Sequence, residues 1–167
     1  MFRKMRRYGQ ALSREECIDI LKNASHGVLA LHGDDDYPYA VPMSYVYEND
    51  RLYFHGARSG HRMDSVMKDE KASFCVVSAD DVIPEEYATY YKSVIVFGRI
   101  RALTGKDEMI SSAETLAEKY NPGDTPEGRL SEIDKEFSRL AMFEMTVEHM
   151  TGKQARGLVS ESGQDEI

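Results

Sequence analysis

The 167-residue sequence predicts a mainly β fold, an antiparallel barrel or curved sheet with a few peripheral helices. Three observations lead to this expectation. Short apolar or alternating runs recur along the chain with turn residues between them, as in strands joined by turns. Only four segments carry apolar residues at helical spacing. Strands and helices do not alternate regularly, which disfavours a doubly wound nucleotide-binding fold.

The first helix is expected to follow Ser13. Ser13 and Glu16 have the spacing of a capping box, and apolar residues then recur at helical spacing until Gly27. Further helices are expected over residues 62–69, 109–120 and 130–137, the first of them with Met63, Val66 and Met67 on its inner face. Strands are expected at residues 28–31, 40–47, 51–55, 72–77, 93–102 and 141–147.

Other stretches lack a clear period. Residues 78–92 combine Pro84 with acidic residues and three tyrosines, so we expect a long loop that can fold over a site or a partner subunit. Gly98 predicts a bulge or a close backbone approach inside its strand. The polar tail is expected to be disordered, which leaves a single domain over residues 1–158 and a tail over 159–167.

Composition disfavours several classes of protein. Hydrophobic residues make up 41% of the chain and charged residues 30%, and no apolar run approaches the roughly 20 residues that span a bilayer. The formal net charge of −8 disfavours nucleic-acid binding, which needs surplus lysine and arginine. Polar residues follow the basic start of the chain, so we expect no secretory signal and interpret the protein as cytoplasmic.

Cysteines and histidines give no clear metal site. Cys17 lies in a predicted helix and Cys75 in an apolar strand, so both are expected to be small buried hydrophobes and not a disulfide. The five histidines have no established ligand spacing, and we expect no protein-bound metal. No serine-histidine-acid order, P-loop or GxGxxG motif is present, and no catalytic residue can be assigned.

The glycine-containing loop before the second predicted helix has the composition of an anion site. Gly56 and Gly60 permit backbone conformations closed to other residues, and Ser59, His61 and Arg62 offer hydrogen-bond donors. A helix that begins near Arg62 would also direct its first backbone N–H groups towards the loop. These residues predict the binding of a ligand that carries phosphate.

Five segments are distinctive when taken together: PYAVPMSYVYE (38–48), YFHGARSGHRMD (53–64), SFCVV (73–77), KSVIVFGRIRAL (92–103) and EHMTGKQA (148–155). In content and order they resemble the pyridoxamine 5′-phosphate oxidase-like FMN-binding split barrels, and within them the group related to nitroimidazole-resistance proteins. The resemblance covers most of the chain. It implies an antiparallel, Greek-key-like split β-barrel, and a homodimer that holds FMN at its subunit interface.

The resemblance places the flavin ring along the strand around residue 43. Backbone groups there are expected to bond the edge of the ring, while Pro42, Met43, Ser44 and Tyr45 shape the pocket. A proline inside a strand needs an edge or a missing ladder partner, and a ligand-facing edge supplies one. An ordinary edge strand is the alternative.

The resemblance also assigns the FMN phosphate to the loop that ends at Arg62. His55, Gly56 and Ala57 lie at the start of this loop, and His61 and Arg62 lie at its end. The planar guanidinium of Arg62 can hold two phosphate oxygens, although relatives often carry lysine there, and the small Ala57 leaves room for the ribityl chain. His55 and His61 could instead be surface or structural histidines.

Two more segments complete the expected site. Ser93, with Val94 beside it, begins a strand where relatives often place a polar side chain against the flavin of the partner subunit. Thr151, Gly152 and Lys153 form a small polar and cationic turn that could approach the ring edge or the phosphate. A cation at Lys153 would stabilise the anionic reduced ring, whereas a solvated lysine is the alternative.

Two functions follow from the resemblance. The first is an FMN-dependent oxidoreductase that passes electrons from a nicotinamide nucleotide or another donor to a small flat acceptor of nitroaromatic, quinone-like or pyridoxine-like type. Pyridoxamine phosphate itself is disfavoured, because that enzyme's C-terminal pattern of tryptophan and arginines is absent and the chain has no tryptophan. The second is a binding protein without turnover, which holds FMN as a sensor or store, or haem through His149.

Overall fold

The computed structural model describes residues 1–159. They form eight strands, β1 (Ala11–Leu12), β2 (His26–His32), β3 (Pro38–Ser44), β4 (Val46–Glu48), β5 (Arg51–Ala57), β6 (Lys71–Ile83), β7 (Ala88–Ala102) and β8 (Leu140–Gln154). The four α-helices are α1 (Arg14–Asn23), α2 (His61–Lys68), α3 (Lys106–Tyr120) and α4 (Pro126–Glu136). Every strand pairing is antiparallel, so the predicted mainly β, antiparallel fold is confirmed.

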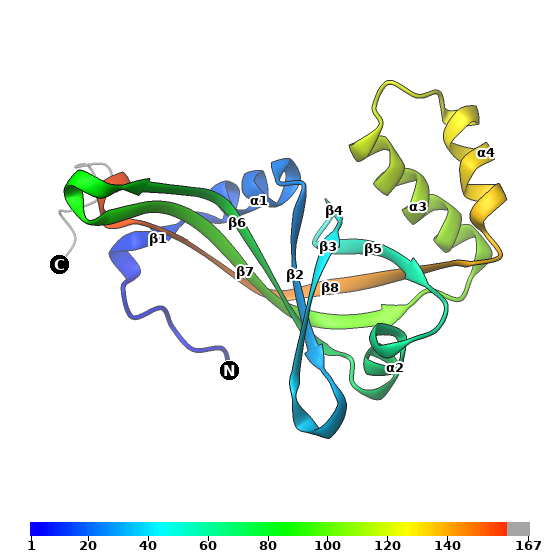
Figure 1. Cartoon of the computed structure of the whole chain (residues 1–167), viewed down its shortest axis with the longest axis horizontal. Coiled ribbons are helices and arrows are strands. Elements are labelled where there is room, and N and C mark those ends of the chain that lie inside the picture. The colour runs from blue at the N-terminus through cyan, green and yellow to red at the C-terminus, as the bar shows by residue number, and fades with distance from the viewer. Residues whose placement is uncertain (160–167) are drawn as a thin grey trace.

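The strands form one sheet in the order β3-β2-β6-β7-β8-β5-β4, with β1 paired to β8. The two ends of this order, β3 and β4, are consecutive in the chain and are joined by Tyr45 alone. The sheet therefore curls until its edges approach, and β3 contacts β5 without pairing to it (Figure 1). We call this opening between β3 and β5 the seam. Among residues 1–159, β3 has a ladder partner only on its β2 side.

The inner face of the curled sheet carries the main core. Leu29, Phe54, Phe74, Val94 and Met145 belong to it and are fully or almost fully buried. The ring of Phe74 meets the ring of Tyr45 edge-on at 4.7 Å. Aromatic pairs of this kind contribute about 0.5–1.5 kcal/mol beyond the burial of their area. The core thus holds the sheet in its curled shape.

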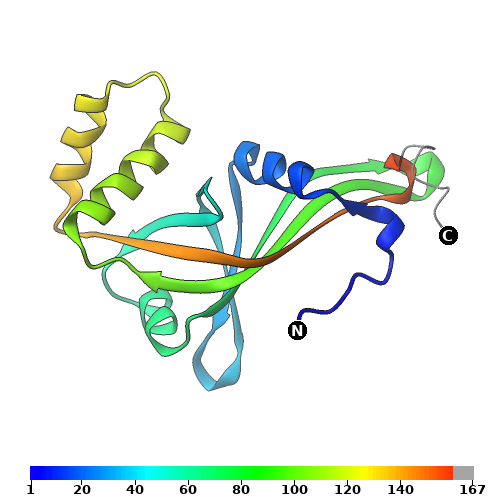
Figure 2. The same cartoon turned by 180° about the vertical axis from the view of Figure 1, so that it is seen from behind.

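Residues 78–92 are not the predicted loop. There β6 and β7 continue as a hairpin, with Asp80 opposite Tyr91 and Val82 opposite Thr89, around a 3₁₀ turn at Pro84–Glu86. The hairpin projects from the barrel beside the end of β8, which extends to Gln154 and not only to residue 147 (Figures 1 and 2). Because most of its side chains are exposed on both faces, no apolar alternation marks these strands in the sequence.

The bulge and the close backbone approach predicted at Gly98 are both confirmed. A register shift in the β7–β8 ladder falls between Phe97 and Gly98. A Cβ at Gly98 would lie 2.0 Å from the carbonyl oxygen of Thr146, so the two backbones approach too closely for any side chain there. The β4–β5 turn uses Asn49 and Asp50, both at positive φ, as a two-residue hairpin turn requires.

The helices largely follow the prediction. Ser13 and Glu16 form the expected capping box of α1, whereas α3 and α4 begin earlier than predicted, at Lys106 and Pro126. On α2, Val66 is buried and Met63 half-buried, but Met67 is 73% exposed, so its predicted inward position is wrong. Within residues 1–159, no helix has the length and apolar character needed to cross a membrane. The predicted tail lies outside the described residues from residue 160 onward.

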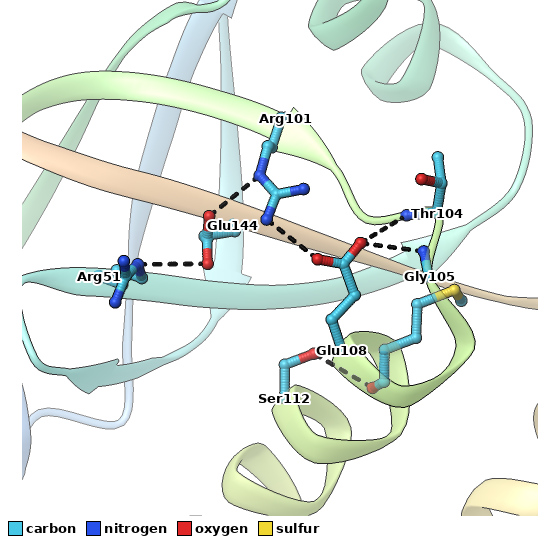
Figure 3. A network of polar contacts seen from close by, with 8 residues as sticks. Arg51, Arg101, Thr104, Gly105, Glu108, Ser112 and Glu144 are labelled. Carbon is cyan, nitrogen blue, oxygen red and sulfur yellow. Dashed lines mark hydrogen bonds and ion pairs between the residues drawn. The ribbon is translucent and has the colours of Figure 1, made fainter.

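Helices α3 and α4 pack beside the barrel as a hairpin, and a polar network fastens its base (Figures 1 and 3). Arg101 Nε lies 3.0 Å from Glu144 Oε1, and Arg101 Nη2 lies 3.1 Å from Glu108 Oε2. The other oxygen of Glu144 lies 3.4 Å from Arg51 Nε. Glu108 Oε1 also accepts the backbone N–H of Gly105 at 2.9 Å. These contacts tie β5, β7 and β8 to the start of α3.

Candidate functional site

Arg62, from the first turn of α2, reaches into the seam. Its Nη1 contacts the sulfur of Met43 on β3 at 2.9 Å, and its guanidinium carbon lies 5.6 Å from the centre of the Phe143 ring. Its Nε is buried and has no hydrogen-bond partner, and no carboxylate of residues 1–159 pairs with the side chain. A half-buried cation without a counterion is costly, which makes this guanidinium a candidate anion ligand.

Gly56 is what allows Arg62 to lie there. A Cβ at Gly56 would lie 1.8 Å from Arg62 Nη2, so only a glycine leaves the guanidinium this place. His55 precedes it on β5, and desolvation together with the charge of Arg62 lowers the pKa of the His55 imidazole. Ala57 is exposed at the end of the strand. The structure therefore gathers His55, Gly56, Ala57 and Arg62 at one end of the seam.

His61 stands at the same end of the barrel. Its ring stacks on Tyr39 of β3 with centroids 4.0 Å apart, and its Nε2 lies 3.7 Å from Asp34 Oδ2. Gly60, at φ 106°, precedes α2 and has no side chain that could cap the helix. Among the described residues, no side chain of the N-cap position therefore bonds the first N–H groups of α2. The sequence did not predict Tyr39 as a site residue, because a strand pattern does not show which aromatic ring a distant histidine contacts.

Arg58 in the same loop has a structural role. Its Nε donates to the carbonyl of Leu140 at 3.0 Å, and its Nη2 donates to the carbonyl of Phe137 at 2.7 Å. It thereby closes the end of the α4–β8 connection. Two arginines four residues apart thus have different surroundings, since one satisfies backbone carbonyls and the other has a free donor.

The four predicted ring residues alternate between the two faces of β3 and its end. Pro42 and Ser44 are exposed, whereas Met43 and Tyr45 are buried in the core. The backbone N–H of Tyr45 donates to the hydroxyl of Tyr120 at 2.9 Å, and that hydroxyl donates to the Tyr45 carbonyl at 3.0 Å. Pro42 lies on an edge strand, as the sequence argument required. Contact of these residues with a flavin ring stays a prediction.

Ser93, Val94, Gly152 and Lys153 lie together, but away from Arg62. Ser93 pairs with Lys153 and Val94 with Gly152 across β7 and β8. Val94 is fully buried, and a Cβ at Gly152 would strike the sulfur of Cys17 on α1 at 2.4 Å. Ser93 lies six residues along β7 from Arg99, which pairs with Lys71 shortly after the end of α2, or about 20 Å along the strand. Within one chain, Ser93 and Lys153 therefore do not lie beside Arg62.

One face of the sheet, which we call the outer face, is exposed and mainly apolar. It consists of two cross-strand rows, Pro42, Val28, Cys75, Ile95 and Thr151, and Ala40, Ala30, Ser73, Phe97 and His149. Ser44, Ser93 and Lys153 also lie on the outer face, because they alternate along their strands with residues that are buried on the inner face. Val28 and Ile95 are each 40% exposed. Contiguous apolar side chains of this kind typically mark an interaction surface.

His149, the candidate haem ligand, belongs to the outer face. Its ring stacks on Phe2 with centroids 4.6 Å apart and an interplanar angle of 9°. Among the described residues, no three His, Cys, Asp or Glu side chains gather in a way that could hold a metal ion. Cys17 and Cys75 are free thiols.

Comparisons with known proteins agree with this architecture. The chain is 28% identical to an uncharacterised protein of Rhizobium meliloti (strain 1021) over 155 residues, which covers 87% of this chain and 95% of that protein. A structure from Bacteroides thetaiotaomicron, whose name proposes 5-nitroimidazole antibiotic resistance, superposes with a TM-score of 0.72 at 16% identity and 86% coverage of both chains. The FAD and haem binding protein of Mycobacterium smegmatis gives a TM-score of 0.74 at 21% identity, covering 91% of this chain and 76% of that chain.

These structural likenesses confirm the predicted split-barrel fold. The family described as pyridoxamine 5′-phosphate oxidase matches residues 13–154, from the cap of α1 to the last residue of β8. This match includes the seam, Arg62 and the outer face. The chain therefore belongs to the pyridoxamine 5′-phosphate oxidase family.

Proposed function

We propose that the protein is a flavoprotein that binds FMN as a homodimer and acts as an oxidoreductase in the cytoplasm. The observation that carries the proposal is Arg62, whose buried Nε has no partner and whose charge meets no carboxylate of residues 1–159. A phosphate would satisfy both the donor and the charge. Proteins of this fold include ones named for flavin binding, which supports a flavin as the bearer of that phosphate.

The residues present fit a terminal phosphate. Arg62 would hold it, with the uncapped N-terminus of α2 and the imidazoles of His55 and His61 close to the same end of the seam. Gly56 and Ala57 would keep the approach free of bulky side chains. The ring would lie along the free edge of β3 at Pro42–Ser44, where backbone groups on the side away from β2 lack a strand partner among residues 1–159, with Tyr45 at its end held by Tyr120.

The homodimer part of the proposal rests on the outer face. It is apolar and exposed, and it carries Ser93 and Lys153 on a part of the sheet that Arg62 of the same chain does not reach. A second copy packed on this face would cover the apolar rows and could bring its Ser93 and Lys153 to the site. Ile95→Glu should then yield monomers, as measured by light scattering. The FMN content, as measured by visible absorption, should be reduced. A dimer that keeps its FMN would contradict this interface.

Bound FMN supplies hydride and single-electron transfer, while the protein supplies position and electrostatics. Arg62 would hold its phosphate, and Lys153 of the second copy would place a cation that favours negative charge on the reduced ring. Reducing equivalents would come from a nicotinamide nucleotide or another donor and pass to a small flat acceptor of nitroaromatic, quinone-like or pyridoxine-like type. With the outer face covered by the second copy, the open edge of β3 is where such a molecule would approach.

Haem or flavin binding without turnover is the competing function. The names of two similar structures mention haem or a flavocytochrome, and His149 is the residue that would ligate iron. Phe2 stacks face-on against its ring, so a haem would have to displace Phe2. Flavin binding without electron transfer differs from the main proposal only in the absence of turnover.

The test is the visible absorption spectrum of the purified protein, followed by chromatography of whatever heat releases. Flavin bands, release of FMN and bleaching by NADH or NADPH are the expected results. Release of FAD would contradict FMN as the cofactor, and an intense haem band would favour His149. Flavin bands that no donor bleaches would support a binding protein without turnover.

A further inference from the structure

A cavity lies on a different side of α2 from the seam, between that helix and the start of the α3–α4 hairpin. Its volume is about 480 Å³, within the range of small-molecule sites. Its lining includes Met63 and Met67 of α2, Met109 of α3, and Phe137 and Leu140 at the junction of α4 and β8. The residues assigned to the flavin above do not line it. It is therefore separate from the seam, although Met63 directly follows Arg62.

The floor of this cavity is apolar, and part of it is not buried in the core. Met67 is 73% exposed although it occupies a position where the helical period predicts an inward side chain. Methionine side chains are flexible and polarisable, and they form favourable contacts with flat aromatic groups. Three methionines and Phe137 around one cavity thus offer a surface suited to a flat apolar body.

Two cations flank the same ring. The guanidinium carbon of Arg58 lies 5.8 Å from the centre of Phe137, and Lys106 Nζ lies 5.7 Å from it. Arg58 uses Nε and Nη2 for backbone carbonyls, whereas Lys106 enters no ion pair with any of residues 1–159. Asp107 directly follows Lys106 but forms no ion pair with it, and Glu108 is engaged by Arg101 and by the backbone of Gly105. The cavity therefore has an apolar floor and an uncompensated positive rim.

We propose that this cavity binds a small aromatic carboxylate. The flat body would rest on Met63, Met67 and Phe137, and the carboxylate would meet Lys106 at the first turn of α3. A neutral molecule of the same shape would satisfy the floor and leave the lysine unpaired, so charge is the feature that selects the ligand. The proposal goes beyond flavin binding and does not require it.

The experiment is titration calorimetry of the purified protein with 2-naphthoate and with its uncharged counterpart 2-naphthamide. We expect naphthoate to bind about fivefold more tightly than naphthamide, the ratio that a partly exposed ion pair gives. Lys106→Met should remove this preference by weakening naphthoate alone. Lys135→Met, at an exposed lysine on α4 paired with Glu132, is the matched control and should leave both affinities unchanged.

Three results would overturn the proposal: no binding of naphthoate at about millimolar concentration, equal binding of the two probes, or an unchanged preference in Lys106→Met. The flavin content of each variant is measured alongside. Lys106→Met should keep the wild-type content, because the residue does not touch the seam. Failure of the carboxylate site therefore leaves the flavin proposal intact, and loss of flavin in the wild type leaves the probe titration interpretable.

Discussion

The arginines at the base of the α3–α4 hairpin and the arginine in the seam have opposite surroundings. Arg101 and Arg51 share Glu144, and Glu108 completes the network of Figure 3. Within residues 1–159, Arg62 has only a methionine sulfur and an aromatic face, and its Nε has no partner. The arginines of this network are thus matched by carboxylates of the same chain. The charge that the fold leaves unmatched is the one expected to meet a ligand.

The largest expected effect comes from removing that unmatched charge. Arg62→Ala should weaken FMN binding by about 1.5–3 kcal/mol, because a charge-assisted contact to phosphate is lost. Arg62→Met keeps the apolar contacts to Met43 and Phe143, and the stability of its apoprotein should equal or exceed that of the wild type. FMN titration and urea unfolding of the apoproteins measure the two quantities. Unchanged FMN affinity would remove Arg62 from the site.

A matched charge should behave in the opposite way. The side chain of Glu144 is only 13% exposed and is paired with two arginines. Glu144→Gln should lower the free energy of unfolding by about 2 kcal/mol, because Arg51 loses its counterion and Arg101 keeps only Glu108. FMN affinity should stay within experimental error of the wild type. A loss of FMN binding without loss of stability would show that the network serves the site and not the fold.

Lys119 is an intermediate case, because it pairs with no acid of residues 1–159 yet is used by the fold. Its Nζ donates to the Ala24 carbonyl at 2.7 Å and lies 4.1 Å from the centre of the Tyr45 ring. Burial lowers the pKa of Lys119 to about 8 from an ordinary value of 10.5. Between these values the unfolded chain binds the proton that the folded chain has released, so stability rises with pH.

Lys119→Met should remove this rise. Relative to the variant, the wild type should gain about 1 kcal/mol of unfolding free energy across that window, after allowance for the partial exposure of the group. Urea unfolding of both proteins at several pH values measures the difference. Parallel pH profiles would mean that the folded pKa is not lowered.

The smallest expected effect tests the space around Arg62 without touching its charge. The methyl group of Gly56→Ala would displace the guanidinium, which is the flexible end of a side chain and can move. FMN affinity should fall by roughly threefold to tenfold, with little change in stability. Gly123→Ala is the control, because no atom of the described residues lies within 4 Å of a Cβ built there. Equal FMN affinity in both variants would show that the position of the guanidinium does not matter.

Much of this fold could be predicted because local signals agreed with tertiary contacts. The capping box of α1, the bulge at Gly98 and the edge position of Pro42 each have a cause in one or two residues. The hairpin over residues 78–92 lacked such a cause. Its strands are held by backbone pairing, and their exposed side chains left no periodic pattern in the sequence.

The candidate site could be predicted only as a set of residue types. A loop with glycines, a histidine and an arginine indicates an anion, but the sequence does not show that Arg58 is used by the carbonyls of Phe137 and Leu140 while Arg62 is free. It also does not show that Tyr120 occupies the backbone groups of Tyr45. Such contacts join residues far apart in the chain, and no local pattern encodes them.

Whether Arg62 holds the phosphate is measured by comparing FMN with riboflavin, which lacks the phosphate, on the wild type and on Arg62→Ala. If Arg62 holds the phosphate, the wild type should prefer FMN over riboflavin, and the substitution should remove about 1.5–3 kcal/mol of that preference while riboflavin binding stays nearly constant. If both flavins lose the same affinity, or if the preference for FMN survives the substitution, Arg62 does not recognise the phosphate.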